Sequence, residues 1–149
     1  MKMKMTYRVP VVEKREYVLL KRLISLSYFH FDGRQPVGVR KLSDLLKSAK
    51  VLDEEEMPED IVRLHTTVTV SQFEADDLQF QIVLPDAVNT KQQLQLESVL
   101  SPIGSECFGL GLGAELQLNS EGKLQNYSII KVKQSNTTKN SISVKQDMD

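Results

Sequence analysis

A short helix signal between two stretches of strand pattern constrains this chain more than any other feature. It occupies residues 100–116, Leu-Ser-Pro-Ile-Gly-Ser-Glu-Cys-Phe-Gly-Leu-Gly-Leu-Gly-Ala-Glu-Leu. Ser101 can cap the helix, and Pro102 suits its first position because the N–H that proline lacks would be unpaired there. About two turns follow, and Gly109 is a natural stop. A short helix set late in a run of β pattern predicts a sheet that curls over one helix.

Alternation of apolar and polar residues predicts the strands of that sheet. The first two strands are expected at 66–73 and 77–84, joined by a polar turn at 74–77. Val68 and Val70 share one face of the first, and the matching positions of the second are Leu78, Phe80, Ile82 and Leu84. A loop at 85–92 precedes a third strand that begins at Leu94. The remaining strands are expected at 115–118 and from a turn at 119–122 through Lys131, followed by a polar tail that should be disordered.

The N-terminal third shows helical periodicity instead. The pattern is helical from Glu13 to about Phe29. Its apolar stripe follows i, i+3, i+4 spacing and consists of Leu20, Leu23, Ile24, Ser27 and Phe31. A second stripe follows Pro36 and consists of Val39, Leu42, Leu45, Leu46 and Ala49. The Asp32-Gly33 turn signal between them predicts an antiparallel helical hairpin. Residues 1–12 are a basic leader that fits either a loop or an edge strand.

These elements predict an α+β protein with a short N-terminal helical hairpin and a C-terminal domain of antiparallel strands with one short helix. At 149 residues the chain has room for one domain and a smaller appendage. The expected boundaries are a basic leader and hairpin at 1–52, an acidic linker at 53–61, the main domain at 62–133 and a disordered tail at 134–149.

The Leu-Ser-Pro-Ile-Gly sequence, the short helix and the glycines at 109 and 113 are similar to the C-terminal domain of the GreA/GreB transcription elongation factors. The likeness extends upstream through Met57-Pro-Glu-Asp-Ile-Val62 and Thr67-Val-Thr-Val70, over roughly residues 57–133. It is closest to the short Rnk-type members, regulators of nucleoside diphosphate kinase. The resemblance implies an FKBP-like curled sheet, although a fold likeness transfers no isomerase activity.

The same resemblance implies a partner, because in that family the Ser-Pro turn docks on the rim of the RNA polymerase secondary channel. Ser101 and Pro102 match the docking motif, and Ser105 on the same helix is taken as a third docking residue. Two positions depart from the family pattern. Leu100 stands where the cleavage factors often have Asp or Asn, and Ala114 replaces an Asp that commonly follows the glycine. A plain helix cap is the alternative role of Ser101.

Cleavage factors of the family carry an acidic pair at the tip of a long coiled coil, where it helps hold a second catalytic Mg²⁺. Here the expected tip offers Asp32 alone, with Arg34 two residues away. Mg²⁺ is bound poorly by one carboxylate without help. Arms of about 16 residues span about 24 Å, roughly half the length of a Gre-type coiled coil. Both departures weigh against stimulation of RNA cleavage.

Charge is strongly segregated along the chain, although its formal net value is only −1. Residues 1–50 hold 12 Lys/Arg against 4 Asp/Glu, whereas residues 51–98 hold 2 against 11. Two interpretations stay open: the basic hairpin approaches nucleic acid or an acidic partner, or the two segments attract each other within the fold. The basic hairpin surface is expected to consist of Lys14, Arg15, Lys21, Arg22, Arg40 and Lys41.

Catalytic and metal signals are weak. Cys107 is the only cysteine, and His30 and His65 lie far apart, so neither a zinc site nor a Cys/His nucleophile is expected. The run Gly109-x-Gly111-x-x-Ala114 formally fits a dinucleotide fingerprint, but a helix precedes it and a strand follows, which is the reverse of the required context. No cofactor, metal or small-molecule substrate is therefore expected.

The sequence lacks a membrane-spanning stretch and the apolar core of a secretory signal, so a cytoplasmic location is expected. The leading hypothesis is a non-enzymatic, polymerase-binding transcription regulator of the GreA/GreB family that does not reach the active site. Nucleic acid could contact its basic hairpin. Two alternatives stay open: a cleavage-stimulating factor that uses Asp32, and an interaction module whose partner is not polymerase.

Overall fold

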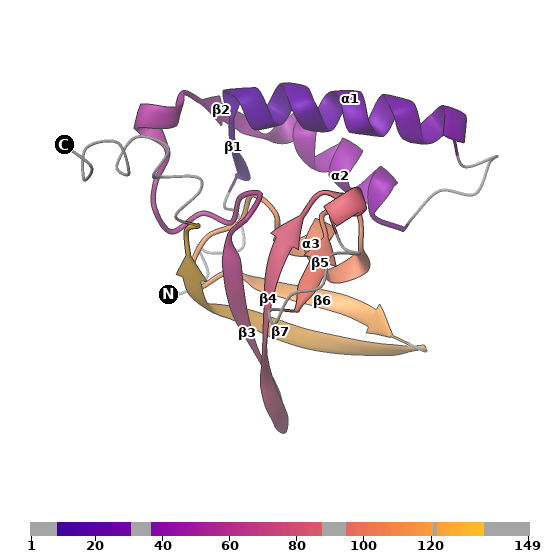
Figure 1. The fold of residues 1–149 in the computed structure, drawn as a ribbon. Helices are drawn as coiled ribbons and strands as arrows, with labels where there is room; N and C mark the ends of the chain where they lie inside the picture. The colour runs from indigo at the N-terminus through magenta and orange to yellow at the C-terminus, as the bar shows by residue number, and fades with distance from the viewer. Residues whose placement is uncertain (1–8, 31–36, 88–94, 121, 136–149) are drawn as a thin grey trace.

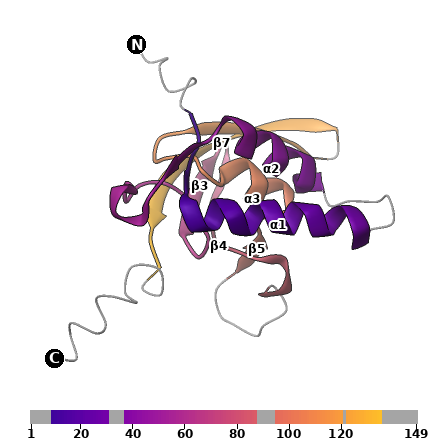
Figure 2. The same cartoon turned by 90° about the horizontal axis from the view of Figure 1, so that it is seen from above.

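The computed structural model describes residues 9–30, 37–87, 95–120 and 122–135. Two helices lie along one side of a five-stranded sheet, with a third, short helix beneath them (Figure 1). In the view from above the short helix, α3 (Pro102–Cys107), is seen between the two long helices (Figure 2). The mixed α+β architecture with a helical N-terminal part confirms the predicted fold class.

The helical pair consists of α1 (Lys14–His30) and α2 (Val37–Ser48), close to the predicted ranges. The predicted apolar stripes are their buried faces, because Leu20, Ile24, Val39, Leu42 and Leu46 are all buried. These side chains belong to one continuous core with residues of the sheet and of α3. The hairpin is therefore packed on the rest of the molecule instead of standing free, while the proposed domain boundaries remain a prediction.

A small parallel sheet closes the base of the helical pair. Strand β1 (Val11–Glu13) runs into α1, strand β2 (Lys50–Leu52) leaves α2, and Val12 pairs with Val51. A 3₁₀ turn, η2 (Glu54–Glu56), follows directly. The leader thus contributes a strand, one of the two options that the sequence left open, and part of the expected acidic linker is ordered structure. Neither short strand has a pattern that could predict its distant partner.

The main sheet has the strand order β5-β4-β3-β7-β6. Its strands are β3 (Thr67–Gln72), β4 (Ala75–Val83), β5 (Leu96–Ser98), β6 (Glu115–Ser120) and β7 (Lys123–Lys133). Neighbours are antiparallel except β4 and β5, which are parallel, so the prediction of a purely antiparallel sheet is wrong at this edge. The third strand starts at Leu96, and Leu94 lies outside the described residues.

Two details of the β3–β4 hairpin differ from the prediction. Its turn is Phe73-Glu74 instead of 74–77, with Glu74 in the left-handed region at φ 58°, and β4 already begins at Ala75. As a result the hairpin extends past the core, and Leu78 is 37% exposed although it shares a face with buried Phe80 and Ile82. A second 3₁₀ turn, η3 (Pro85–Ala87), follows β4.

The C-terminal segment is fixed one residue further than predicted. The Gln134 side chain accepts a hydrogen bond from the Thr66 hydroxyl at 2.8 Å and donates to the carbonyls of Glu59 and Ile61. The predicted disorder therefore does not start at Gln134, and residues 136–149 lie outside the described part. Among the described residues, no helix is both long and apolar enough to cross a membrane.

Candidate functional site

The predicted Ser-Pro motif begins helix α3 (Pro102–Cys107). The Ser101 hydroxyl accepts a hydrogen bond from the Gly104 N–H at 3.0 Å, and Pro102 occupies the first turn. Gly109 follows the helix with φ +84°, a backbone conformation that glycine adopts without strain. The capping role of Ser101 is confirmed. Pro102 is exposed and Ser101 half-buried, so both present surface at this helix end.

The prediction that Ser105 is a docking residue is wrong, because the Ser105 side chain is buried, with 1% exposure. Its hydroxyl donates to the Pro102 carbonyl at 3.2 Å, and its Cβ lies against the first turn of α2. A β-carbon built on Gly38 would come within 2.3 Å of the Leu100 oxygen and 2.8 Å of the Ser105 Cβ. Ser105 therefore serves a close helix–helix contact, which its spacing from Ser101 does not reveal.

Leu100 also belongs to this contact. It is buried, and its carbonyl accepts a hydrogen bond from the Gly38 N–H at 3.0 Å. The apolar residue that departs from the family pattern thus packs in the core. Ala114, the second departure, is buried too. Both replacements are consistent with packing in this chain.

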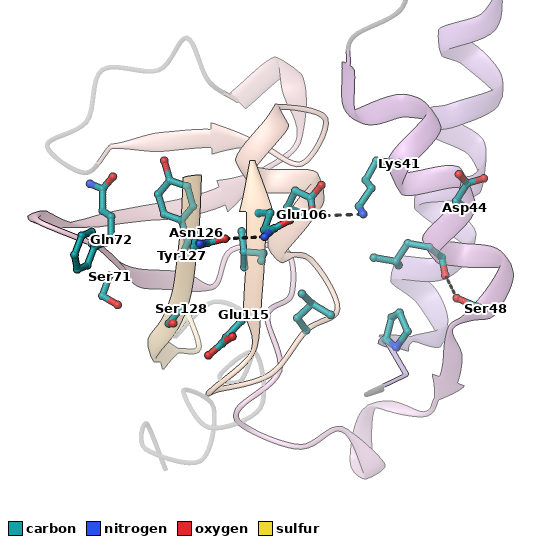
Figure 3. Close-up of a pocket in the computed structure, with 16 residues that line it drawn as sticks. Lys41, Asp44, Ser48, Ser71, Gln72, Glu106, Glu115, Asn126, Tyr127 and Ser128 are labelled. Atoms are coloured by element: carbon teal, nitrogen blue, oxygen red, sulfur yellow. Dashed lines mark hydrogen bonds and ion pairs between the residues drawn. The ribbon is translucent and has the colours of Figure 1, made fainter. Parts of the chain in front are cut away.

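A groove of about 1110 Å³ separates α2 from the sheet next to α3. It is lined by Lys41 and Asp44 of α2, by Glu106 of α3, and by parts of β3, β6 and β7 (Figure 3). Within this lining, Lys41 and Glu106 form an ion pair at 3.4 Å. Pro102 and Glu106 are four residues apart and thus on one side of α3, so the Ser-Pro end and the groove form adjacent parts of one surface.

A buried ion cluster, which sequence reasoning missed, joins the base of α1 to the main sheet. The buried Arg63 guanidinium holds both carboxylate oxygens of Glu54, at 2.9 and 2.7 Å. It also bonds Glu16 at 3.2 Å and lies 3.9 Å from buried Glu13. Burial raises the pKa of Glu16, whereas the Arg63 hydrogen bond lowers the pKa of Glu54. An arginine inside the apolar run Ile-Val-Arg-Leu was the available signal.

Nucleophilic and metal chemistry find no support in the described part of the chain. No group of three His, Cys, Asp or Glu side chains there could hold a metal ion. Cys107 is buried, and burial raises the pKa of its thiol to about 12. This confirms Cys107 as a core residue. His65 sits at a turn with φ 72°, where its N–H donates to the Ile82 carbonyl.

Comparison with known proteins shows to which family this chain is related. The family model described as "Transcription elongation factor, GreA/GreB, C-term" matches residues 57–134. The chain belongs to the GreA/GreB family. That match begins after η2 and ends at Gln134, so it holds α3 and the whole five-stranded sheet, whereas the hairpin lies outside it.

Relatives in the GreA/GreB family agree with the assignment. The chain is 29% identical over 97 residues to the transcription elongation factor GreA of Clostridium acetobutylicum, a match that covers 64% of this chain and 60% of that protein. It is 28% identical to GreA of Brucella anthropi, over 81% of this chain and 71% of the relative. A GreA/GreB factor from Nitrosomonas europaea has the same fold, with a TM-score of 0.66, 22% identity and coverage of 85% and 98%. The nearer likeness to Rnk-type members stays a prediction.

Acidic residues of the same chain neutralise part of the basic hairpin surface of this GreA/GreB family member. Lys14 pairs with Asp53 at 3.2 Å, and Arg15 with Glu13 at 3.3 Å and Glu54 at 3.8 Å. Of these, Lys14–Asp53 and Arg15–Glu54 join the basic and acidic segments, which therefore do attract each other within the fold, whereas Lys41 pairs with Glu106 of α3. Lys21 lies over the Tyr17 ring, and Arg22 and Arg40 are exposed without an ion pair to any described residue.

The expected hairpin tip, Asp32 and Arg34, lies outside the described residues. The sequence alone describes this segment, and it has no second carboxylate between residues 31 and 36. The acidic run Asp53–Glu56 lies at the opposite end of the hairpin, where Asp53 and Glu54 pair with residues of the first α1 turn. It is thus far along the chain from the tip, and Asp53 and Glu54 are already paired.

Proposed function

We propose that this GreA/GreB family member is a non-enzymatic transcription regulator that binds RNA polymerase at the secondary-channel rim, in the bacterial cytoplasm, without stimulating transcript cleavage. Docking on polymerase is supported by one observation, the exposed Pro102 at the start of a helix that Ser101 caps. Its backbone is fixed by the cap, by the Gly109 stop and by the contact with α2, so the surface is already in place before a partner arrives. Such preorganisation lowers the entropic cost of binding.

The absence of cleavage stimulation is supported by the length of the helices. Helix α1 has 17 residues and α2 has 12, which correspond to about 26 and 18 Å. A cleavage factor needs roughly twice that reach to bring carboxylates to the polymerase active site.

The attachment of the hairpin shortens its reach further. Gly38 is the second residue of α2, and it already touches Leu100 of the main domain. At the other end, Glu16 of α1 bonds Arg63. Both ends of the described hairpin are thus held against the domain, and little of it projects as a free arm.

Docking is tested by equilibrium binding of labelled protein to core RNA polymerase. Pro102→Ala keeps the Ser101 cap, and it is expected to weaken binding at least fivefold with an unchanged melting temperature. The matched control is Pro58→Ala, which removes a proline at another exposed position. Unchanged binding of Pro102→Ala would assign docking to another surface, and no binding by the wild type would favour a partner other than polymerase.

Cleavage is tested separately on backtracked elongation complexes. We expect no acceleration of transcript cleavage by the wild type at saturating concentration, and therefore no effect of Asp32→Asn. Acceleration that Asp32→Asn abolishes would establish the alternative, a cleavage factor with a reduced tip. Because binding to core polymerase and cleavage in elongation complexes are measured separately, binding without cleavage and failure to bind give distinct results.

A further inference from the structure

The outer face of the main sheet carries two lysines that no acidic residue of the described part neutralises. Lys131 and Lys133 on β7 are both exposed, and neither forms an ion pair with a described residue. On the hairpin, Lys14, Arg15 and Lys41 are paired, whereas Arg22 and Arg40 also lack an ion pair to a described residue. The two ammonium groups therefore keep their full attraction for an outside anion.

Strand pairing sets these lysines at the end of two polar rows. Thr67 pairs with Gln81 on β4 and Lys133 on β7, and Thr69 pairs with Gln79 and Lys131. Each row runs from an amide through a hydroxyl to an ammonium group, and the rows lie about 7 Å apart along the strands. They line a hollow of about 320 Å³ together with Gln134 and Ser135. Among the described residues, no carboxylate and no aromatic ring lines it.

Hydrogen bonds within the rows determine which polar atoms face a ligand. The Gln81 amide donates through Nε2 to the His65 carbonyl at 3.0 Å, and the Gln79 amide donates through Nε2 to the Thr69 hydroxyl at 3.3 Å. Both amides are thereby oriented, and their Oε1 atoms stay available as acceptors. The hollow thus offers cations on β7 and acceptors on β4, two strands away, about 10 Å apart.

We propose that this face binds single-stranded RNA, with the Lys131 and Lys133 ammonium groups on backbone phosphates and the Gln79 and Gln81 carbonyl oxygens on ribose hydroxyls. Phosphates alone would gain nothing from the amide oxygens, whereas a ribose 2′-OH donates to them, so the acceptors favour RNA over DNA and over free phosphate. Because no aromatic ring is present for bases to stack on, binding is independent of base sequence. The site lies apart from the Ser-Pro surface and does not depend on polymerase docking.

Fluorescence anisotropy of a labelled 12-nucleotide oligouridylate with the full chain tests this site without polymerase. Two phosphate contacts contribute about 1.4 to the slope of log affinity against log salt, so raising salt from 50 to 200 mM costs about sevenfold more in the wild type than in Lys131→Gln with Lys133→Gln. The charge-matched control is Lys50→Gln with Lys123→Gln, two exposed lysines outside the hollow, which should keep the wild-type slope.

The acceptor half is tested with oligothymidylate of equal length, which should bind about 25-fold more weakly, because two hydrogen bonds worth about fivefold each are lost. Equal binding of RNA and DNA would overturn the acceptor role. Equal effects of the two lysine pairs, or no binding at 50 mM salt, would overturn the site. Loss of binding in Arg22→Gln with Arg40→Gln, but not in the Lys131/Lys133 variant, would move RNA to the hairpin. Thermal melts confirm that each variant is folded.

Discussion

Replacement of Arg63 by methionine is the sharpest test of how the hairpin is held on the domain. Methionine is apolar and of similar length, so it fills much of the space while removing the charge. The change leaves the largely buried Glu16 without its cation and leaves buried Glu13 with Arg15 alone. Removing one partner from a buried ion pair costs about 3–5 kcal/mol, a large share of the roughly 5–15 kcal/mol that holds a domain together.

Urea unfolding at pH 7, followed by circular dichroism, measures this loss. With a slope of about 2 kcal/mol/M, a loss of about 4 kcal/mol lowers the midpoint by about 2 M. Arg15→Met is the matched control, since Arg15 also pairs with Glu13 and Glu54 but its side chain is 77% exposed. Exposed pairs contribute about 0–1 kcal/mol. Similar midpoints for the two variants would refute the buried-cluster argument.

A second variant separates loss of charge pairing from loss of packing. Adding Glu16→Gln to Arg63→Met removes one stranded charge, so the double variant should be more stable than Arg63→Met alone by about 1–3 kcal/mol. In the wild-type background the same change removes bonds to Arg63 and to the Leu64 N–H and should destabilise. Equal destabilisation by Glu16→Gln in the wild type and in Arg63→Met would show that the unpaired Glu16 charge does not cause the instability of Arg63→Met.

The pH dependence of the cluster has a defined sign. Because burial raises the pKa of Glu16, its protonation favours the folded state, and that contribution is complete below the ordinary value of 4.5 and lost as pH rises through the folded pKa. Wild type should therefore gain stability relative to Glu16→Gln as pH falls from 7 towards 4.5. Glu54 has a lowered pKa, so wild type should lose stability relative to Glu54→Gln as pH falls below 4.5. Urea midpoints across this range check both signs.

Three further changes test the α3 region. Ser101→Ala removes the helix cap and should cost about 1 kcal/mol in thermal melts; Ser101→Asp, which can still accept from Gly104, should restore most of it. Gly38→Ala forces a β-carbon against the Leu100 carbonyl and should cost about 1–3 kcal/mol, and a neutral result would mean that α2 shifts freely on α3. Cys107 should resist iodoacetamide at pH 8 in the folded chain and react at the unfolding rate.

Local patterns predicted most of the elements in this chain. The i, i+3, i+4 stripes located both long helices because each helix buries one face, and alternation located β3 and β4 for the same reason. Ser101, Pro102 and Gly109 predicted α3 with its cap and stop, since these residue types act on their own backbone. Such signals need no knowledge of distant partners.

What the sequence did not reveal depends on contacts between distant segments. The β1–β2 pair joins residues about 40 positions apart, and the parallel β4–β5 contact follows a connection of a dozen residues. Ser105 was misassigned because its neighbour Gly38 lies on another helix. Glu13, Glu16 and Glu54 come from β1, α1 and η2, and Arg63 comes from the loop before β3, so no local pattern in the sequence brings their charges together.

Contacts at both ends of the hairpin fix its orientation relative to α3, and therefore relative to any partner that binds α3. The Gly38 N–H bonds the carbonyl of Leu100, the residue just before Ser101, so a partner held at Ser101 and Pro102 also fixes the start of α2. The Arg63 cluster fixes the start of α1 independently. Arg63→Met should therefore loosen the base of the hairpin without moving the docking end. In the proposed complex this predicts near-normal polymerase affinity for a folded Arg63→Met variant, whereas Gly38→Ala, which disturbs the contact behind the docking motif, should weaken binding as well as stability.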